Sequence, residues 1–281
     1  MTNKEFIMQN YDIPAVPMVA VRILKLIDDP KTTVEDLQKA IMADQALAAR
    51  VLKMANSAFY GVRHNVDTIS GAITIMGFNT IRNLTLAIAT REVYKSFGLI
   101  EQKLWEHSLG VSIASGMIAS KIPAVKNEEA VVAGLLHDVG KVIMNNAEPE
   151  RFALLTHRVY EERVTYSDIE EEVFGFTHAE AGHILAERWG FPEMLCNVIY
   201  HHHKCLGDLD NDPYFSLLCC TVALADAICV RLGVGYRGPM ADLNLPIEGL
   251  GIRLGINSEM LEEIVTRFKL SYIEEKLTYQ F

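Results

Sequence analysis

The chain has 281 residues, half of them hydrophobic, and a formal net charge of −10. A chain of this length can form one large domain or two closely packed subdomains with a sizeable hydrophobic core. Disulfide bonds are therefore not needed for folding. The acidic balance argues against a general nucleic-acid-binding surface, because such surfaces require clustered Lys and Arg.

The cysteines and the hydropathy pattern together predict where in the cell the protein is located. The five cysteines are odd in number and include no CxxC pair, which argues against a zinc ribbon or a disulfide framework. The N-terminus lacks the features of a secretion signal, and no stretch reaches the roughly 18 uninterrupted apolar residues of a membrane span. We therefore expect a cytoplasmic protein with reduced thiols and neither membrane nor nucleic acid as a partner.

The first third of the chain shows the pattern of short helices separated by polar breaks. Apolar residues follow helical spacing over residues 18–27, and a helix is predicted over residues 45–55. Polar residues that could cap helices here are Thr32 with Glu35 as a capping box, Asp44, Ser70 and Thr80. No convincing alternation typical of a strand occurs, so this part is predicted to be helical.

The second part of the chain continues the helical pattern. A helix over residues 104–119 is lined with small residues and should pack closely against neighbouring backbones, and the next helix spans about residues 130–144. Further helices are expected over residues 149–162, 166–174, 179–189, 192–203 and 215–232, and an amphipathic pair of helices is expected over residues 258–279. The sequence thus predicts an all-α fold with four parts: an N-terminal tail (1–12), an N-terminal helical subdomain (13–98) packed on a helical bundle (99–233), and a C-terminal helical extension (234–281).

A histidine, an aspartate and a lysine interrupt the otherwise apolar helix over residues 130–144: His137, Asp138 and Lys141. Burying an unpaired carboxylate is costly, so Asp138 must be paired or bind a cation. On a helix, Lys141 lies four residues after His137 and three after Asp138, which places its ammonium over the same surface. A bound phosphate would suit that position.

Two further residues extend this pattern. Asp226 is the single acid in the middle of a second apolar helix, and it too requires a cation. His107 stands near the start of the helix of small residues. Imidazole and carboxylate ligands together suit Fe, Mn, Zn or Ni. With the His-Asp pair, these two residues make a four-ligand set from three helices that leaves positions open for water and substrate.

An isolated histidine, a His-Asp pair and a distant Ala-Asp resemble the signature of the HD superfamily of metal-dependent phosphohydrolases. The segments 44–61, 72–77 and 81–84 more closely resemble the HDOD (HD-related output domain) family of bacterial signalling proteins. That resemblance covers roughly residues 12 to 232. It implies a helical HD-type fold, a divalent metal centre and a role in signal transduction.

The segments 176–182 and 199–202 are similar to motifs of HD-GYP phosphodiesterases, whose histidines complete a binuclear centre. This similarity implies three further metal ligands: His178, His201 and His202. The HD-GYP family continues with an acidic segment and a Gly-Tyr-Pro loop, which are absent after His203, so hydrolysis of cyclic di-GMP is not implied. The site would hold two ions, or a single ion if only the first four ligands bind metal.

Other polar residues are interpreted as structural. His183 lies five residues after His178, about 140° around a helix, so it should face away from the site. We expect His203 to be an ordinary surface or core histidine, and the acidic residues 170–172 to form a solvated face.

Two functions are consistent with these features. In the first, the chain is a signalling module whose metal centre binds a signalling protein of unknown identity or a phosphate-containing ligand. In the second, it is a working phosphohydrolase on a phosphate ester or nucleotide, in which Asp138 positions the attack and Lys141 stabilises the phosphoryl oxygens. No feature indicates an oligomeric state.

Overall fold

The computed structural model describes residues 31–56, 65–78, 98–207, 212–235, 238–240 and 242–279, together with residues 5, 7, 11, 18, 21, 22, 25, 26, 81, 85 and 93. The chain divides into two compact units, one of Met1–Pro14 with Tyr94–Lys269 and one of Ala15–Val93 with Leu270–Phe281. All regular secondary structure in the described residues is helical, which confirms the predicted all-α class.

The smaller unit contains α3 (Val34–Met42), α4 (Gln45–Ala55) and α5 (Ile69–Met76), which pack on one another. Leu37 and Ile41 of α3 are buried with Val51 of α4. Asp44 accepts a hydrogen bond from the backbone N–H of Leu47 at 3.0 Å, which confirms it as the cap of α4.

Two predicted caps of this unit are shifted along the chain. The capping box of α3 uses Thr33 and Asp36, one residue later than the predicted Thr32 and Glu35. Leu37, Ala40 and Ile41 of α3 are buried, and the hydroxyl of Thr32 donates to the carbonyl of Leu26 at 2.8 Å instead of capping the helix. In the same way α5 is capped by Thr68 rather than Ser70; Thr80 lies outside the described residues.

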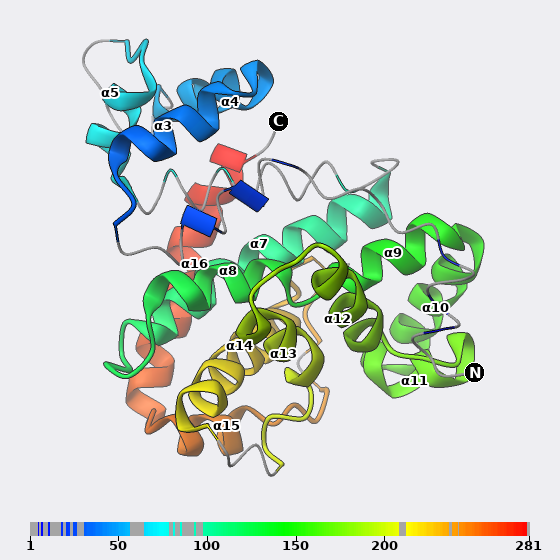
Figure 1. Cartoon of the computed structure of the whole chain (residues 1–281). Helices are drawn as coiled ribbons and strands as arrows, with labels where there is room; N and C mark the ends of the chain where they lie inside the picture. The colour runs from blue at the N-terminus through cyan, green and yellow to red at the C-terminus, as the bar shows by residue number, and fades with distance from the viewer. Residues whose placement is uncertain are drawn as a thin grey trace. The chain divides into compact units, whose positions relative to one another are not determined.

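The larger unit holds the remaining helices (Figure 1). They are α7 (Leu99–Ala119), α8 (Asn127–Leu136), α9 (Val139–Ala147), α10 (Pro149–Glu162), α11 (Tyr166–Phe174), α12 (His178–Arg188), α13 (Glu193–His201), α14 (Pro213–Leu232), α15 (Ile247–Leu254) and α16 (Ser258–Tyr279), the last of which belongs to this unit up to Lys269. Helix α7 packs along α8 and α14, and α12 packs against α9 and α13.

Small residues bring α7 and α8 close together, as predicted for the helix over residues 104–119. The hydroxyl of Ser112 donates to the carbonyl of Val131 at 2.9 Å, and the amide of Asn127 donates to the carbonyl of Gly116 at 2.6 Å. A Cβ added at Gly134 would lie 2.8 Å from the carbonyl oxygen of Val111, so only glycine permits this approach.

The helix predicted over residues 130–144 is broken in two. Helix α8 ends at Leu136 and α9 begins at Val139, with His137 and Asp138 at the break. Consecutive residues of one helix point about 100° apart, whereas the break lets both of these side chains face the same interior. The interruption therefore serves the placement of the His-Asp pair.

Helices α9 and α12 cross where two glycines meet. A Cβ added at Gly140 would lie 1.9 Å from the carbonyl oxygen of His178 and 2.6 Å from the backbone nitrogen of Gly182. This contact between backbones fixes the first turn of α9, which carries Lys141, against the first turn of α12, which carries His178.

Helix α14 is the one helix among the described residues with the length and apolar composition of a membrane span, and 72% of its most apolar window is buried inside the fold. Asp226 interrupts this apolar sequence. All five cysteines are free and buried, three of them on α14, as expected for small hydrophobic side chains.

Candidate metal centre

One group of side chains lies around Oδ2 of Asp138. Nε2 of His107, on α7, lies 3.6 Å from Oδ2 of Asp138, and Nε2 of His137 lies 3.4 Å from the same oxygen. Oδ1 of Asp226, on α14, lies 3.0 Å from Nε2 of His107 and 4.0 Å from Nε2 of His137. The four residues that the sequence predicted as a ligand set are thus brought together, and we call them the first ligand group.

A second group of side chains lies around Oδ1 of Asp138. Nε2 of His178, at the start of α12, lies 3.1 Å from Oδ1 of Asp138, and Nε2 of His202 lies 3.9 Å from it. Nε2 of His178 also lies 3.3 Å from Nε2 of His202 and 3.0 Å from Nε2 of His203. Asp138, His178, His202 and His203 have the spacing of a metal site, and we call them the second ligand group.

Of the three consecutive histidines, the structure places His202 and His203 in the site, whereas the sequence predicted His201 and His202. Helix α13 ends at His201, whose ring lies against Tyr200 and Phe215 at centroid distances of 4.7 and 5.8 Å. The structure does not bring His201 into either ligand group. His203, which was interpreted as an ordinary histidine, lies in the second group instead. It follows the end of the helix and is exposed, and its Nε2 lies 3.0 Å from that of His178.

In each of the four buried histidines, Nδ1 lies within hydrogen-bond distance of an acceptor oxygen. Carbonyl oxygens lie next to Nδ1 in three of them: Val234 at 3.0 Å from His107, Gly134 at 2.8 Å from His137, and Ile199 at 2.7 Å from His202. In His178 the neighbour is Oε2 of Glu170, at 2.6 Å. Because a carbonyl or carboxylate oxygen can only accept, each Nδ1 carries the hydrogen, which leaves Nε2 of each ring facing the site. Burial alone would lower the pKa of His178, but the carboxylate of Glu170 beside it raises that pKa to about 9, so this ring is protonated at neutral pH when no metal is bound.

The donor set fits a metal ion. Lone pairs of neutral imidazoles and carboxylate oxygens repel one another at distances of 3 to 4 Å, and a cation removes that repulsion. Nε2 of His137 has no hydrogen-bond partner although it is fully buried. Burial holds the pKa of His137 and of His202 below its ordinary value, which favours the neutral ring that binds metal.

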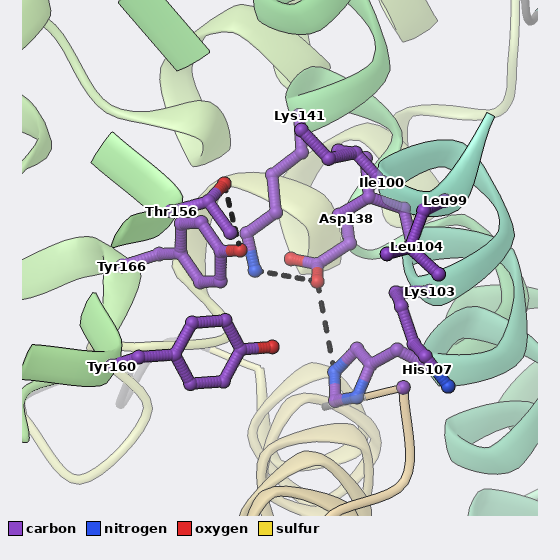
Figure 2. A pocket seen from close by; sticks show the side chains of 11 residues that line it. Leu99, Ile100, Lys103, Leu104, His107, Asp138, Lys141, Thr156, Tyr160 and Tyr166 are labelled. Atoms are coloured by element: carbon purple, nitrogen blue, oxygen red, sulfur yellow. Dashed lines mark hydrogen bonds and ion pairs between the residues drawn. The ribbon is translucent and has the colours of Figure 1, made fainter. Parts of the chain in front are cut away.

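Lys141 is the cationic partner of Asp138. Its Nζ donates to Oδ2 of Asp138 at 2.6 Å and lies 4.5 Å from the ring centre of Tyr166, and Figure 2 shows the lysine and His107 both directed at the carboxylate. Burial alone would raise the pKa of Asp138, but His137 and Lys141 beside it hold that pKa well below its ordinary value. Asp138 is therefore ionised at neutral pH.

Glu170 is a buried residue that the sequence reading missed. Its side chain is fully buried, and Oε2 accepts from both the backbone N–H of His178 at 2.9 Å and Nδ1 of the same residue at 2.6 Å. The expectation of a solvated face over residues 170–172 is thus wrong for Glu170. A signal was available, because Tyr166, Glu170 and Phe174 follow a four-residue spacing, and all three are buried in α11. His183 lies away from the site as predicted, with Nδ1 3.0 Å from the carbonyl of Cys196.

Two cavities adjoin the centre, and Lys141 and Tyr166 line both. The smaller, of about 50 Å³, is the one in Figure 2; it lies on the side of His107 and is lined mainly by apolar atoms of Leu99, Ile100 and Leu104. The larger, of about 370 Å³, reaches the centre beside His202, His203 and Asp226. The larger cavity gives a small ligand access to both ligand groups.

Comparison with known proteins places this geometry in a family. The HDOD domain family model matches residues 13–205. The crystal structure of an HDOD domain protein of unknown function from Geobacter sulfurreducens is 30% identical, covers 96% of this chain and 94% of its own, and superimposes with a TM-score of 0.78. A candidate phosphohydrolase from Shewanella amazonensis is 25% identical over 91% of this chain and 90% of its own, with a TM-score of 0.67.

Curated relatives are longer than this chain. Ribonuclease Y of Lactobacillus gasseri is 26% identical over 194 residues, which is 68% of this chain but 29% of that protein. An uncharacterized protein of Treponema pallidum is 29% identical over 198 residues, 69% of this chain and 38% of its own length. The family model matches more than half of the chain and the Geobacter structure shares its fold, so the chain belongs to the HDOD domain family.

Proposed function

We propose that this chain is a bacterial signalling module that binds one or two divalent transition-metal ions at the two ligand groups and binds a partner or a phosphate-containing ligand there. The observation that carries the proposal is the convergence of four Nε2 atoms, each with its Nδ1 held by an acceptor, on the two oxygens of Asp138. The mixed imidazole and carboxylate set favours Fe, Mn, Zn or Ni over Mg or Ca. The buried, reduced thiols fit a cytoplasmic protein.

Hydrolysis of a phosphate ester or nucleotide is the second candidate function. The larger cavity beside the ligand groups and the similarity to a ribonuclease Y and to a candidate phosphohydrolase favour it. A divalent ion, when bound, supplies polarisation of a phosphoryl oxygen and a more acidic water. Asp138 would be held ionised by Lys141, and the ammonium of Lys141, which has three hydrogens and donates one to Asp138, would stabilise phosphoryl oxygens in either adjoining cavity.

Metal analysis tests the shared premise of both functions. We expect natively purified protein, reconstituted with Mn, Fe or Zn, to hold up to two ions per chain. Asp226→Ala should lose the ion of the first ligand group and keep the other, because Oδ1 of Asp226 lies 3.0 Å from Nε2 of His107 and 4.0 Å from Nε2 of His137, both in the first group. Elemental analysis measures both quantities. Less than 0.1 ion per chain in the reconstituted wild type would exclude the metal centre.

A screen of the metal-loaded protein separates the two functions. If phosphomonoesters, nucleotides and cyclic dinucleotides all remain intact, the enzyme hypothesis fails for those classes and the binding module stands. Turnover that disappears in Lys141→Met, with the metal content retained, would instead favour the phosphohydrolase, because Lys141 contacts the ligand Asp138 without being a ligand itself.

Glu170→Gln is expected to weaken metal binding at the second ligand group about 10- to 100-fold, the usual cost of losing a carboxylate behind a metal-binding histidine. The amide oxygen can still accept from Nδ1 of His178, so the ring stays in place, but it loses the negative charge that raises its basicity. Titration with Mn²⁺ followed by calorimetry gives both affinities. The exposed Glu171→Gln, on the same helix, is the matched control and should change neither. Equal losses at both ligand groups would contradict this role.

A further inference from the structure

The residues that line the larger cavity are of two chemical kinds, which we call its polar wall and its apolar wall. One is polar and charged, with His202 and His203 of the second ligand group, Asp226 of the first, and Lys204. The other is apolar and comprises Leu206 and Leu250 together with Ala223, Ala227 and Val230 of α14, the helix that also carries Asp226. A ligand that fills the cavity must therefore present a polar end to the ligand groups and an apolar body to the apolar residues.

The apolar wall lies almost wholly outside the segment that defines the family. The HDOD model ends at residue 205, whereas Leu206, the α14 residues and the segment from Asn244 to Leu250 come after it. Helix α15 packs on α14, so this segment is fixed by the same helix that carries Asp226. The family domain thus supplies the histidines and Lys204 of the polar wall, and the later part of the chain supplies Asp226 and the apolar wall.

The charged residues that line the larger cavity indicate what could bind the polar end of a ligand. Lys141 and Lys204 are opposed by Asp168 and Asp226. Lys141 already donates to Asp138, and Asp168 bonds to Thr165 in the capping box of α11. The side chains alone therefore provide no excess of positive charge for an anion, and bound metal must provide it. A volume of about 370 Å³ lies at the lower end of the range for small-molecule sites.

We propose that this cavity takes a compact phosphate monoester, with its phosphate against the ligand groups and a short apolar or aromatic body against Leu206, Val230 and Leu250. This inference rests on the proposed metal centre. The segment after residue 205 is then the part of the chain that selects the ligand.

Two phosphonates with the same head group test the proposal in the metal-loaded full chain. Phenylphosphonate and methylphosphonate differ only in the apolar body, and neither can be hydrolysed. Isothermal titration should show phenylphosphonate bound about tenfold more tightly, the gain expected when one face of a ring is removed from water. Leu206→Asn should reduce that ratio to about twofold or less and leave the affinity for methylphosphonate unchanged.

The control is Ile252→Asn, which replaces an equally apolar and exposed residue of α15 that does not line the cavity. It should leave the tenfold ratio intact. Both substitutions are at exposed side chains, with relative exposures of 50% for Leu206 and 74% for Ile252, so the fold should tolerate them.

Other results would overturn the inference, and they are distinguishable from a failure of the metal centre. If the protein binds metal but binds the two phosphonates equally, or if Leu206→Asn leaves the ratio unchanged, the apolar wall does not select the ligand. Tighter binding of a ten-nucleotide oligouridylate than of phenylphosphonate would indicate an RNA strand instead. If metal is absent and neither phosphonate binds, both the inference and the proposed function fail.

Discussion

Replacing Asp138 with alanine is expected to abolish metal binding at both ligand groups, not at one. Oδ2 of Asp138 faces His107 and His137, and Oδ1 faces His178 and His202, so one carboxylate serves both groups. Elemental analysis after reconstitution should therefore give less than 0.1 ion per chain, the level of a protein without a site.

The same substitution should destabilise the fold, because Lys141 is buried and loses the carboxylate to which it donates at 2.6 Å. Removing one member of a buried ion pair costs about 3–5 kcal/mol. Loss of metal in Asp138→Ala alone would thus be open to the objection that the site has unfolded.

The double variant Asp138→Ala with Lys141→Met answers that objection. Methionine replaces the buried ammonium with an apolar side chain of similar length, and replacing both members of a buried pair is often neutral or stabilising. We expect its free energy of unfolding, measured in urea, to return to within about 1 kcal/mol of that of the metal-free wild type, while its metal content stays at zero. If Asp138→Ala keeps one ion, the two ligand groups do not share this carboxylate.

The ligands of the first group could be predicted from the sequence because each one breaks a local rule. Asp138 and Asp226 are acids within apolar helices, and such acids must find a cation or a partner. The structure brings both together with His107 and His137. Their common location followed from chemistry and from the family resemblance, before any geometry was known.

The second group was less predictable because it depends on where a helix ends. Three consecutive histidines point in three directions, and only the end of α13 at His201 decides which two face the site. Helix ends are the least certain feature of a sequence reading. The burial of Glu170 was not predicted for another reason. Its two acidic neighbours made the segment resemble a solvated face.

The break between α8 and α9 had only a weak sequence signal, in Asp138, a residue type favoured at helix starts, and Gly140, a residue type unfavourable inside helices. No proline stands at residues 130–144, and the pattern there is continuous for a helix. The break arises from tertiary packing, because the first turn of α9 must lie against the backbone of α12 at Gly140 while Asp138 faces both ligand groups.

Gly140→Ala is accordingly expected to be among the most damaging single substitutions away from the ligands. The added Cβ would lie 1.9 Å from the carbonyl oxygen of His178 and 2.6 Å from the nitrogen of Gly182, and both are backbone atoms that cannot rotate away. Overpacking of a core typically costs about 1–3 kcal/mol, and a clash between backbones lies at or above the upper end. A loss of about 3 kcal/mol should lower the melting temperature by about 6–12 °C.

The matched control is Gly249→Ala, which adds the same methyl group to a helix at an exposed position where the nearest atom, of Leu206, lies 3.4 Å away. Alanine is the better helix former, so this variant should be neutral or more stable by up to about 1 kcal/mol. Gly140→Ala should also weaken metal binding at the second ligand group before the first, because separating α12 from α9 moves His178 of α12 away from Asp138, whereas His107 and His137 lie outside α12. Equal melting temperatures for the two alanine variants would show that α9 and α12 can separate without cost, and the close glycine contact would then not be what holds the second group together.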